Sequence, residues 1–256
     1  MLTVARLAGL LVATEPRLGR TRLIAVDGRS GAGKTWLAEV LAAPLGAPVI
    51  HMDDLYPGWD GLTEAAGPLA EWVIDPLSKG EPARWRRFDW DTMSYAEWHT
   101  APPADVVVVE GCGSVRSALD AAYAARIWVD APTAARRERL RARPDWAAYE
   151  PFARRWAAQE DQLYRTEHTR RHCDVIVENP RPATHGDPSL RVRLRGRGLY
   201  RPDGACFIRS AGPGRSGTGP RPRPGSPPGR WPRPGPRRPV PPVRRPAPLA
   251  PPPSRG

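Results

Sequence analysis

The sequence has little lysine, few cysteines and no long apolar run. Only Lys34 and Lys79 are lysines among the 39 basic residues of the 256-residue chain. The three cysteines (Cys112, Cys173, Cys206) show no CxxC or Cys/His spacing, which argues against a disulfide framework or a zinc site and favours a reducing cytoplasm. The apolar run near the N-terminus is too short to span a bilayer. We expect it to form a packing helix rather than a signal peptide, and we expect no membrane partner.

Charge and proline are divided unevenly along the chain. Residues 181–256 hold 17 of the 39 Lys and Arg residues and 20 of the 33 prolines, but only 2 of the 27 Asp and Glu. This composition offers almost no apolar side chains to bury, so it predicts a disordered C-terminal tail with polyproline II character. We expect one folded domain over residues 1–180. The net charge of +12 therefore belongs to the tail and does not indicate a basic groove on the domain.

The role of residues 181–256 stays open at this point. Arginines among prolines suit nucleic-acid binding by counterion release, or PxxP contacts with SH3-type partner domains. Repetitive Arg, Pro and Gly are also what high-GC coding sequence yields in an unselected frame. An extended or shifted reading frame is therefore an equal alternative.

Short apolar runs alternate with segments of helical periodicity over residues 1–180. Strands are expected at 21–28, 47–54, 103–111, 124–132 and 173–179. Helices are expected at 34–46, 65–78, 114–125, 132–143 and 151–171. This alternation predicts an α/β fold, a three-layer sandwich around a five-stranded parallel sheet, with ligands at the carboxyl ends of the strands.

A phosphate-binding loop follows the first of these strands. Gly28-x-x-x-x-Gly33-Lys34-Thr35 matches the P-loop pattern, with a strand before it and a helix after it, as the mechanism requires. Its glycines let backbone N–H groups converge on phosphate oxygens, and the helix N-terminus adds positive charge. The expected ATP-binding residues are Gly28, Arg29, Ser30, Gly31, Ala32, Gly33, Lys34 and Thr35. The fold class is therefore that of a P-loop NTPase.

The rest of the sequence favours a kinase among P-loop proteins. The Asn-Lys-x-Asp motif with which GTPases read guanine is absent. Motor ATPases usually need a longer chain and a strand ending in Asp or Asp-Glu, whereas the apolar strand here ends in a single Glu110. A compact kinase, with its second substrate opposite the P-loop, remains.

Candidate catalytic groups follow the second and fourth strands. Asp53 and Asp54 end the second strand, where a carboxylate can accept the proton of an attacking hydroxyl and lie near Mg²⁺. Of the two, Asp53 is the favoured base; a solvated turn or helix cap is the alternative. Thr35, Glu110 and Asp53 are the expected Mg²⁺ residues.

Arginines at helical spacing follow the fourth strand. Arg136, Arg139 and Arg143 lie in the segment 132–143, which can form a lid whose guanidiniums stabilise the transferring phosphoryl group. A solvated helix face is the alternative. We take Arg136 and Arg139, with Lys34, as catalytic candidates.

Aromatic and charged residues alternate in "RWRRFDWDTMSYAEWH", residues 84–99. This composition suits a wall of the acceptor site, although aromatics of the buried core would give the same pattern. The segment contains three of the candidate substrate-binding residues, Phe88, Asp89 and Trp90.

The motifs together resemble one known family. "IAVDGRSGAGKT", "VIHMDDLYPGW", "RRFDW", "VVVVEG" and "IWVDAPTAARRERLRAR" are similar, in order and spacing, to the uridine kinase family of P-loop kinases. They look closest to the short uridine kinase-like proteins of actinobacteria. The resemblance covers about residues 21–178. It implies transfer of the γ-phosphoryl of Mg-ATP to the 5′-hydroxyl of a uridine- or cytidine-like nucleoside.

The resemblance also implies roles for individual residues. Asp53 matches the catalytic aspartate of the family, Glu110 its Mg²⁺-associated glutamate, and Arg136 and Arg139 its lid arginines. Substrate contacts are implied at Asp54, Tyr56, Phe88, Asp89 and Trp90.

Two nucleoside-contacting features of the family are not matched. Its Asp-His-Pro stretch has only Asp60 as a stand-in after "YPGWDG", and its base-contacting histidine falls near Met93. The acceptor could therefore be another small alcohol or a nucleoside monophosphate. A non-catalytic ATP-binding regulator, acting through its basic tail, is the alternative from another functional class.

Overall fold

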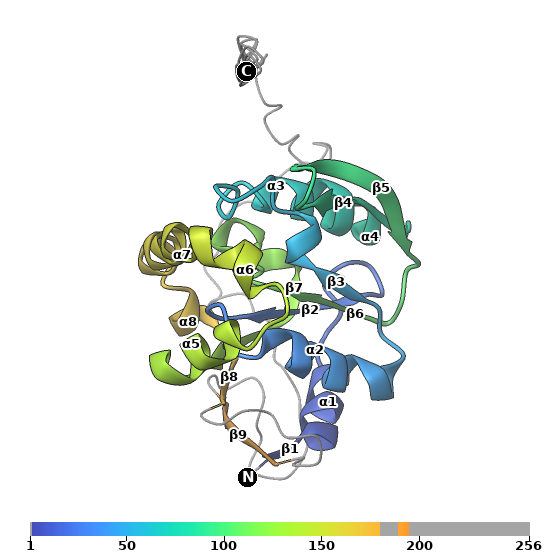
Figure 1. The fold of residues 1–256 in the computed structure, drawn as a ribbon. Coiled ribbons are helices and arrows are strands. Elements are labelled where there is room, and N and C mark those ends of the chain that lie inside the picture. The colour runs from blue at the N-terminus through green and yellow to red at the C-terminus, as the bar shows by residue number, and fades with distance from the viewer. Residues whose placement is uncertain (1, 180–188, 195–256) are drawn as a thin grey trace, which may run out of the picture. The chain divides into compact units, whose positions relative to one another are not determined.

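A central β-sheet organises the chain in the computed structural model, which describes residues 2–179 and 189–194 (Figure 1). Its seven strands follow the order β1-β9-β8-β7-β2-β6-β3. The strands are β1 (Leu2–Thr3), β2 (Arg22–Asp27), β3 (Val49–His51), β6 (Val106–Glu110), β7 (Tyr123–Asp130), β8 (Val175–Glu178) and β9 (Ser189–Leu194). The five strands from β8 to β3 are parallel, which confirms the mostly parallel α/β sheet. The two further strands, β9 and β1, add antiparallel pairs at one edge.

Helices cover both faces of the sheet and make three layers. They are α1 (Val4–Val12), α2 (Lys34–Ala42), α3 (Ala66–Pro68), a π-helical segment (Leu69–Ile74), α4 (Asp75–Ser78), α5 (Thr133–Arg141), α6 (Trp146–Tyr149), α7 (Ala153–Glu167) and α8 (Thr169–His172). Side chains of β2 alternate between the layers, since Ile24 and Val26 pack with α1 and α2 while Leu23 and Ala25 pack with α7 and the π-helical segment. The expected packing helix near the N-terminus is confirmed as α1. Within the described residues, no helix is long and apolar enough to cross a membrane.

A β-hairpin lies outside the main sheet. Strands β4 (Ala83–Asp89) and β5 (Ser94–Ala101) pair antiparallel and form a sheet of their own. The hairpin packs on the π-helical segment and on the 3₁₀ turn Met52–Asp54 that follows β3. The aromatic segment 84–99 is therefore a hairpin beside Asp53.

The expected helix over 114–125 is wrong. The segment is a loop followed by a 3₁₀ helix, Ser117–Ala122, and β7 begins at Tyr123. The backbone N–H groups of Gly113 and Val115 donate to the buried Asp27 carboxylate (both 3.0 Å). The end of the segment belongs to the sheet instead, since Tyr123 and Ala125 pair with Leu23 and Ile24 of β2.

The sheet extends past the expected domain boundary at residue 180. Residues 189–194 form β9, which pairs with β8 and β1, although the composition placed them in the tail. The remainder of 181–256, with the expectation that it is disordered, lies outside the described residues.

Candidate active site

The loop between β2 and α2 forms an anion cradle. Gly31 and Gly33 have φ of 76° and 97°, which L-residues with a side chain rarely adopt. A Cβ on Gly31 would also meet the carbonyl oxygen of Arg136. In the described part of the chain, no protein acceptor receives the backbone N–H groups of Gly31, Gly33, Lys34 and Thr35. These unpaired donors at the N-terminus of the nine-residue α2 are what a phosphate chain needs.

The remaining residues of the loop make protein contacts that hold its shape. Ala32 is buried and donates its N–H to the carbonyl of Arg29 (3.0 Å). The Arg29 side chain pairs with Asp161 (2.6 Å). Ser30 donates both its N–H and its hydroxyl to Glu160 (2.9 and 2.6 Å). These three residues, expected at the nucleotide, therefore shape the loop through its outer side.

Lys34 begins α2 and is buried. Its ammonium donates to the Arg29 carbonyl and to Cys112 Sγ (both 3.3 Å). Burial lowers the pKa of Lys34, but the nearby carboxylates of Glu110, Glu160 and Asp27 raise it, and the net shift is upward. The amine is therefore fully charged and lies against the anion cradle, as a phosphate ligand must.

Oxygen ligands for a divalent cation meet at the ends of α2 and β6. The Thr35 hydroxyl donates to Glu110 Oε1 (3.1 Å), and His51 Nδ1 lies 2.7 Å from the same oxygen. This hydrogen bond is the main cause that raises the pKa of His51. Glu110 is buried (4% exposed), so His51 compensates its charge. His51 was not among the expected site residues; only its place at the end of the second strand hinted at this contact.

Asp53 follows β3 and is exposed to solvent. The surrounding protein and the nearby Glu110 carboxylate raise the pKa of Asp53, while Lys34, Arg143 and His51 oppose that rise. Asp53 lies two residues after His51, which pairs with Glu110 at the carboxyl end of the neighbouring strand β6. It is thus an accessible carboxylate, open to an incoming hydroxyl.

The lid arginines divide into two groups. Arg136 donates to the Ser30 carbonyl, and Arg139 donates to the carbonyls of Gly31 and Ala32 (all 3.2 Å). Both arginines brace the outside of the P-loop. Arg143, just past the end of α5, is the arginine whose charge acts on Asp53.

Three of the expected acceptor-site residues hold the segment that carries Asp53. Tyr56 is buried, and its hydroxyl donates to the Cys112 carbonyl (2.8 Å). Asp54 accepts from Trp85 Nε1 (2.9 Å), and Trp90 Nε1 donates to the Asp53 carbonyl (3.2 Å). These contacts fix the segment after β3 against the hairpin.

Phe88 and Asp89 differ in what they contact. Phe88 is buried and packs edge-on against Trp90 (ring centroids 5.1 Å apart). Asp89 accepts hydrogen bonds from the N–H groups of Asp91 and Thr92 (3.0 and 2.9 Å). The hydrogen bond from Thr92 is the main cause that lowers the pKa of Asp89. Asp89 therefore shapes the hairpin turn, and no contact among the described residues joins its side chain to Lys34 or Glu110.

An aromatic cluster continues this wall and was not expected. Trp59 stacks on Phe152 (centroids 4.4 Å, planes 6° apart) and packs on Trp90 (4.6 Å) and Tyr149 (5.7 Å). The cluster joins the loop after β3, the hairpin and the segment between α5 and α7. Its members lie up to 93 positions apart in the sequence, so spacing alone gave no signal.

Glu160 is a further site residue that the sequence did not indicate. It is buried in α7 (1% exposed), and besides Ser30 its Oε1 lies 3.2 Å from Cys112 Sγ. Burial raises the pKa of Cys112 to about 12, so the thiol is neutral and can donate. A carboxylate thus tethers the P-loop to α7.

The chain was compared with protein families, curated proteins and solved structures, and only solved structures are similar to it. No protein-family model matches the chain, and no curated protein matches it either. Among solved structures, a possible uridine kinase from Bacillus stearothermophilus is similar at 18% identity and a TM-score of 0.49, over 68% of this chain and 96% of that one. A candidate fructose transport system kinase from a Silicibacter species is similar at 20% identity and a TM-score of 0.42, over 66% and 90% of the two chains. Because both TM-scores lie below 0.5, the functional assignment rests on the residues of this chain.

Proposed function

We propose that this protein is a kinase that transfers the γ-phosphoryl group of Mg-ATP to a hydroxyl of a small molecule. One observation supports this above all others. The unpaired N–H groups of the P-loop follow β2, Glu110 ends β6, and the accessible Asp53 follows β3, and these three parallel strands are neighbours in one sheet. A phosphoryl donor and a base for the acceptor therefore have adjacent places.

The donor's phosphates would lie in the cradle of Gly28–Thr35. Backbone N–H groups bind the oxygens, and the Lys34 ammonium neutralises charge on the β- and γ-phosphates. The braces from Arg136 and Arg139 hold the loop in the binding shape.

Mg²⁺ fits the oxygen donors of this site. It prefers carboxylate, hydroxyl and phosphate oxygens and needs only one or two protein ligands beside the phosphates. The Thr35 hydroxyl and the Glu110 carboxylate lie within 3.1 Å of each other, and Asp53 is close enough to Glu110 for their charges to interact. Among the described residues, no group of three or more His, Cys, Asp and Glu could hold a metal by itself, so the phosphates would complete the shell. When bound, the ion neutralises charge that develops on the phosphates.

Asp53 would act as the base. As the acceptor oxygen bonds to the γ-phosphorus, its proton passes to the Asp53 carboxylate and the bond to the β-phosphate oxygen breaks, releasing ADP. Arg143 would stabilise the charge on the transferring group. The aromatic cluster would exclude water from it.

The acceptor is proposed to be a nucleoside resembling uridine or cytidine, phosphorylated at its 5′-hydroxyl. The rings of Trp59 and Trp90 beside Asp53 offer apolar surface for a base. A nucleoside monophosphate or another small alcohol is the alternative acceptor within the same chemistry.

The test is ADP release from Mg-ATP with a panel of acceptors that includes uridine, cytidine, nucleoside monophosphates and simple alcohols. We expect Lys34→Met and Asp53→Asn to reduce turnover by about 10²- to 10⁴-fold, while Asp91→Asn, an exposed carboxylate in the hairpin turn, has no effect. A fully active Asp53→Asn protein would refute the base assignment.

Turnover on no acceptor would favour the non-catalytic alternative. In that case ATP would still bind, and salt-sensitive RNA binding would depend on residues 181–256. We expect the protein in the cytoplasm, in keeping with the free thiols of Cys112 and Cys173.

A further inference from the structure

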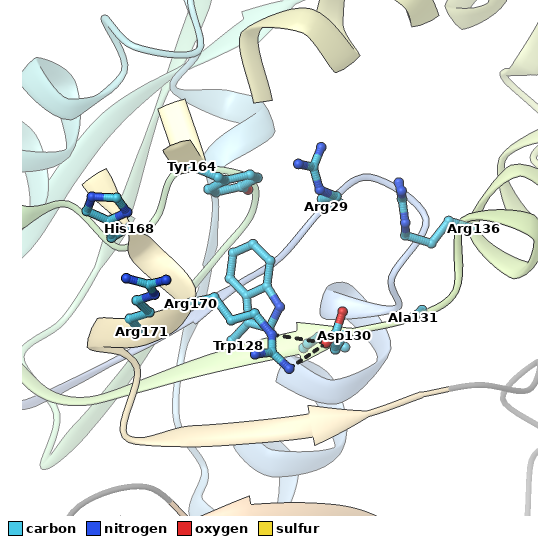
Figure 2. Close-up of a pocket in the computed structure, with 10 residues that line it drawn as sticks. Arg29, Trp128, Asp130, Ala131, Arg136, Tyr164, His168, Arg170 and Arg171 are labelled. Carbon is cyan, nitrogen blue, oxygen red and sulfur yellow. Dashed lines mark hydrogen bonds and ion pairs between the residues drawn. The ribbon is translucent and has the colours of Figure 1, made fainter. Parts of the chain in front are cut away.

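A separate cavity of about 300 Å³ lies at the carboxyl end of β7. Its walls come from β7, the junction of α7 and α8, the start of α5 and the P-loop residue Arg29 (Figure 2). Asp53, Glu110, Lys34 and Thr35 do not line it. The cavity is therefore distinct from the place proposed for phosphoryl transfer.

The lining is strongly basic. Arg29, Arg136, Arg170 and Arg171 line the cavity together with His168, and Asp130 is the one acidic residue among the lining residues. The Asp130 carboxylate is paired with Arg170, which donates two hydrogen bonds to it (2.9 and 3.0 Å; Figure 2).

Arg171 is exposed, and its guanidinium makes no hydrogen bond or ion pair with any residue that the structure describes; its backbone N–H donates to the His168 carbonyl (2.8 Å). Its side chain lines the cavity from the short α8. Arg29 and Arg170 have carboxylate partners. Arg171 is therefore the guanidinium most available to an incoming anion.

Two buried donors at the cavity also lack acceptors. Trp128 is 4% exposed, and its Nε1 has no partner among the described residues; the same holds for Nε of Arg136. Both side chains line the cavity. Buried donors are normally satisfied, and the lining supplies donors in excess of acceptors, so a ligand here has to bring acceptor oxygens.

We propose that this cavity binds a small organic phosphate, a phosphomonoester. Guanidinium groups match phosphate oxygens in charge and geometry. The organic part of the ligand would lie beside the rings of Trp128 and Tyr164, which pack edge-on with centroids 4.8 Å apart. The cavity volume is at the small end of ligand sites, so the ligand is smaller than a nucleoside triphosphate.

The site also touches the P-loop. Arg136 donates to the Ser30 carbonyl (3.2 Å), and Arg29 is itself a loop residue. A phosphate bound to these two arginines therefore acts on the loop from the side opposite its amide cradle.

The test measures binding calorimetrically in a Lys34→Met background, which removes the P-loop ammonium and makes the outcome independent of phosphoryl transfer. The probes are phenyl phosphate, inorganic phosphate and phenol. We expect phenyl phosphate to bind, inorganic phosphate to bind more weakly, and phenol not to bind. Stronger binding of inorganic phosphate would identify a free-phosphate site and overturn the organic part of the proposal.

Matched charge reversals then locate the binding. Arg171→Glu should weaken phenyl phosphate by about tenfold or more, the usual effect of losing a charge-assisted hydrogen bond. Arg165→Glu makes the same charge change on an exposed α7 residue outside the cavity and should change the affinity less than about twofold. Thermal melts show whether Arg171→Glu disturbs folding. If it does, Arg171→Gln replaces it and should also weaken the binding of phenyl phosphate.

Three results would overturn the proposal. They are binding of phenyl phosphate to the wild type but not to Lys34→Met, equal loss of affinity in both charge reversals, and unchanged affinity in Arg171→Glu. The first would assign the phosphate to the P-loop, and the second would reduce the effect to overall charge.

Discussion

Asp27 is the buried residue on which the loops of the site converge. It ends β2 at 0% exposure, and its Oδ1 accepts hydrogen bonds from Gly28 N–H (2.6 Å) and Tyr164 hydroxyl (2.8 Å). Gly113 and Val115 donate to it as well. One carboxylate thus joins the start of the P-loop, the loop after β6 and helix α7.

Burial of Asp27 predicts an unusual pH dependence of stability. Burial raises its pKa from an ordinary 3.8 to about 6, against the hydrogen bonds that lower it. The folded carboxyl therefore binds its proton more tightly than the unfolded one, so its contribution is greatest below pH 3.8 and is lost as pH rises to about 6. The free energy of unfolding of the wild type minus that of Asp27→Asn should fall by about 2 kcal/mol between pH 4 and pH 7. Chemical denaturation measures both; a difference that is constant or rises with pH would contradict the assignment.

A substitution of Gly31 by alanine tests whether the conformation of the anion cradle is needed for ATP binding. Gly31→Ala adds a Cβ at a φ of 76°, against the backbone of Arg136, so the loop must move. We expect ATP affinity to fall by at least about tenfold, since strain of about 1–3 kcal/mol is added to the binding shape. Gly67→Ala is the control, because its Cβ would meet nothing within 4 Å and its φ is not positive. Equal ATP affinities in the two variants, measured calorimetrically, would argue against the cradle.

At the scale of elements, α7 acts on the P-loop through Glu160. The Glu160 carboxylate takes two hydrogen bonds from Ser30 and lies 3.7 Å from Arg29. It is buried, so removing it leaves Ser30 donors without their acceptor. The position of α7 and the shape of the P-loop are therefore coupled.

Glu160→Ala should lower the free energy of unfolding by about 2–4 kcal/mol, because buried donors and a cation lose their partner. ATP affinity should fall with it. Glu160→Gln restores an acceptor and should lie between Ala and wild type in both measurements. Asp161→Asn removes the partly exposed partner of Arg29 and should cost less than about 1 kcal/mol. An Ala variant as stable as Asp161→Asn would show that Glu160 does not hold the loop.

The elements differ in how far the sequence could predict them. Contiguous signals were enough for the strand, loop and helix around Lys34, because glycine placement and apolar periodicity are local properties. The hairpin β4–β5 was missed because its turn has no Gly or Asn, and Met93 adopts a positive φ of 53° instead. The false helix over 114–125 shows the opposite error, since the end of that segment pairs with β2, a strand far away in the sequence.

The candidate site divides in the same way. Lys34, Thr35, Asp53 and Glu110 follow strands whose carboxyl ends meet, so topology alone brought them together. The tether of Glu160 to Ser30 spans 130 positions. The periodicity of apolar residues along the chain cannot predict a contact between residues so far apart in the sequence.

At the scale of the whole molecule, composition misplaced the end of the folded domain. Arginine and proline after residue 180 suggested a tail, yet β9 completes the sheet within it. Val177 pairs with Val192 and Val175 with Leu194. Val192 and Leu194 also pack on the core under α1 and α2. The strand both covers the edge of β8 and holds β1, so its removal exposes an edge and apolar surface together.

Two truncated chains test this boundary. A chain of residues 1–194 keeps every described strand, whereas a chain of 1–180 loses β9 and the partner of β1. Two half-buried apolar side chains contribute roughly 2–3 kcal/mol, so we expect the shorter chain to melt about 5–10 °C lower than 1–194 in a thermal scan. The 1–194 chain should melt within about 2 °C of the full-length protein, because it retains the whole described core. Equal melting temperatures for 1–180 and 1–194 would mean that β9 adds nothing to the sheet, and the folded domain would then end at residue 180, where composition placed it.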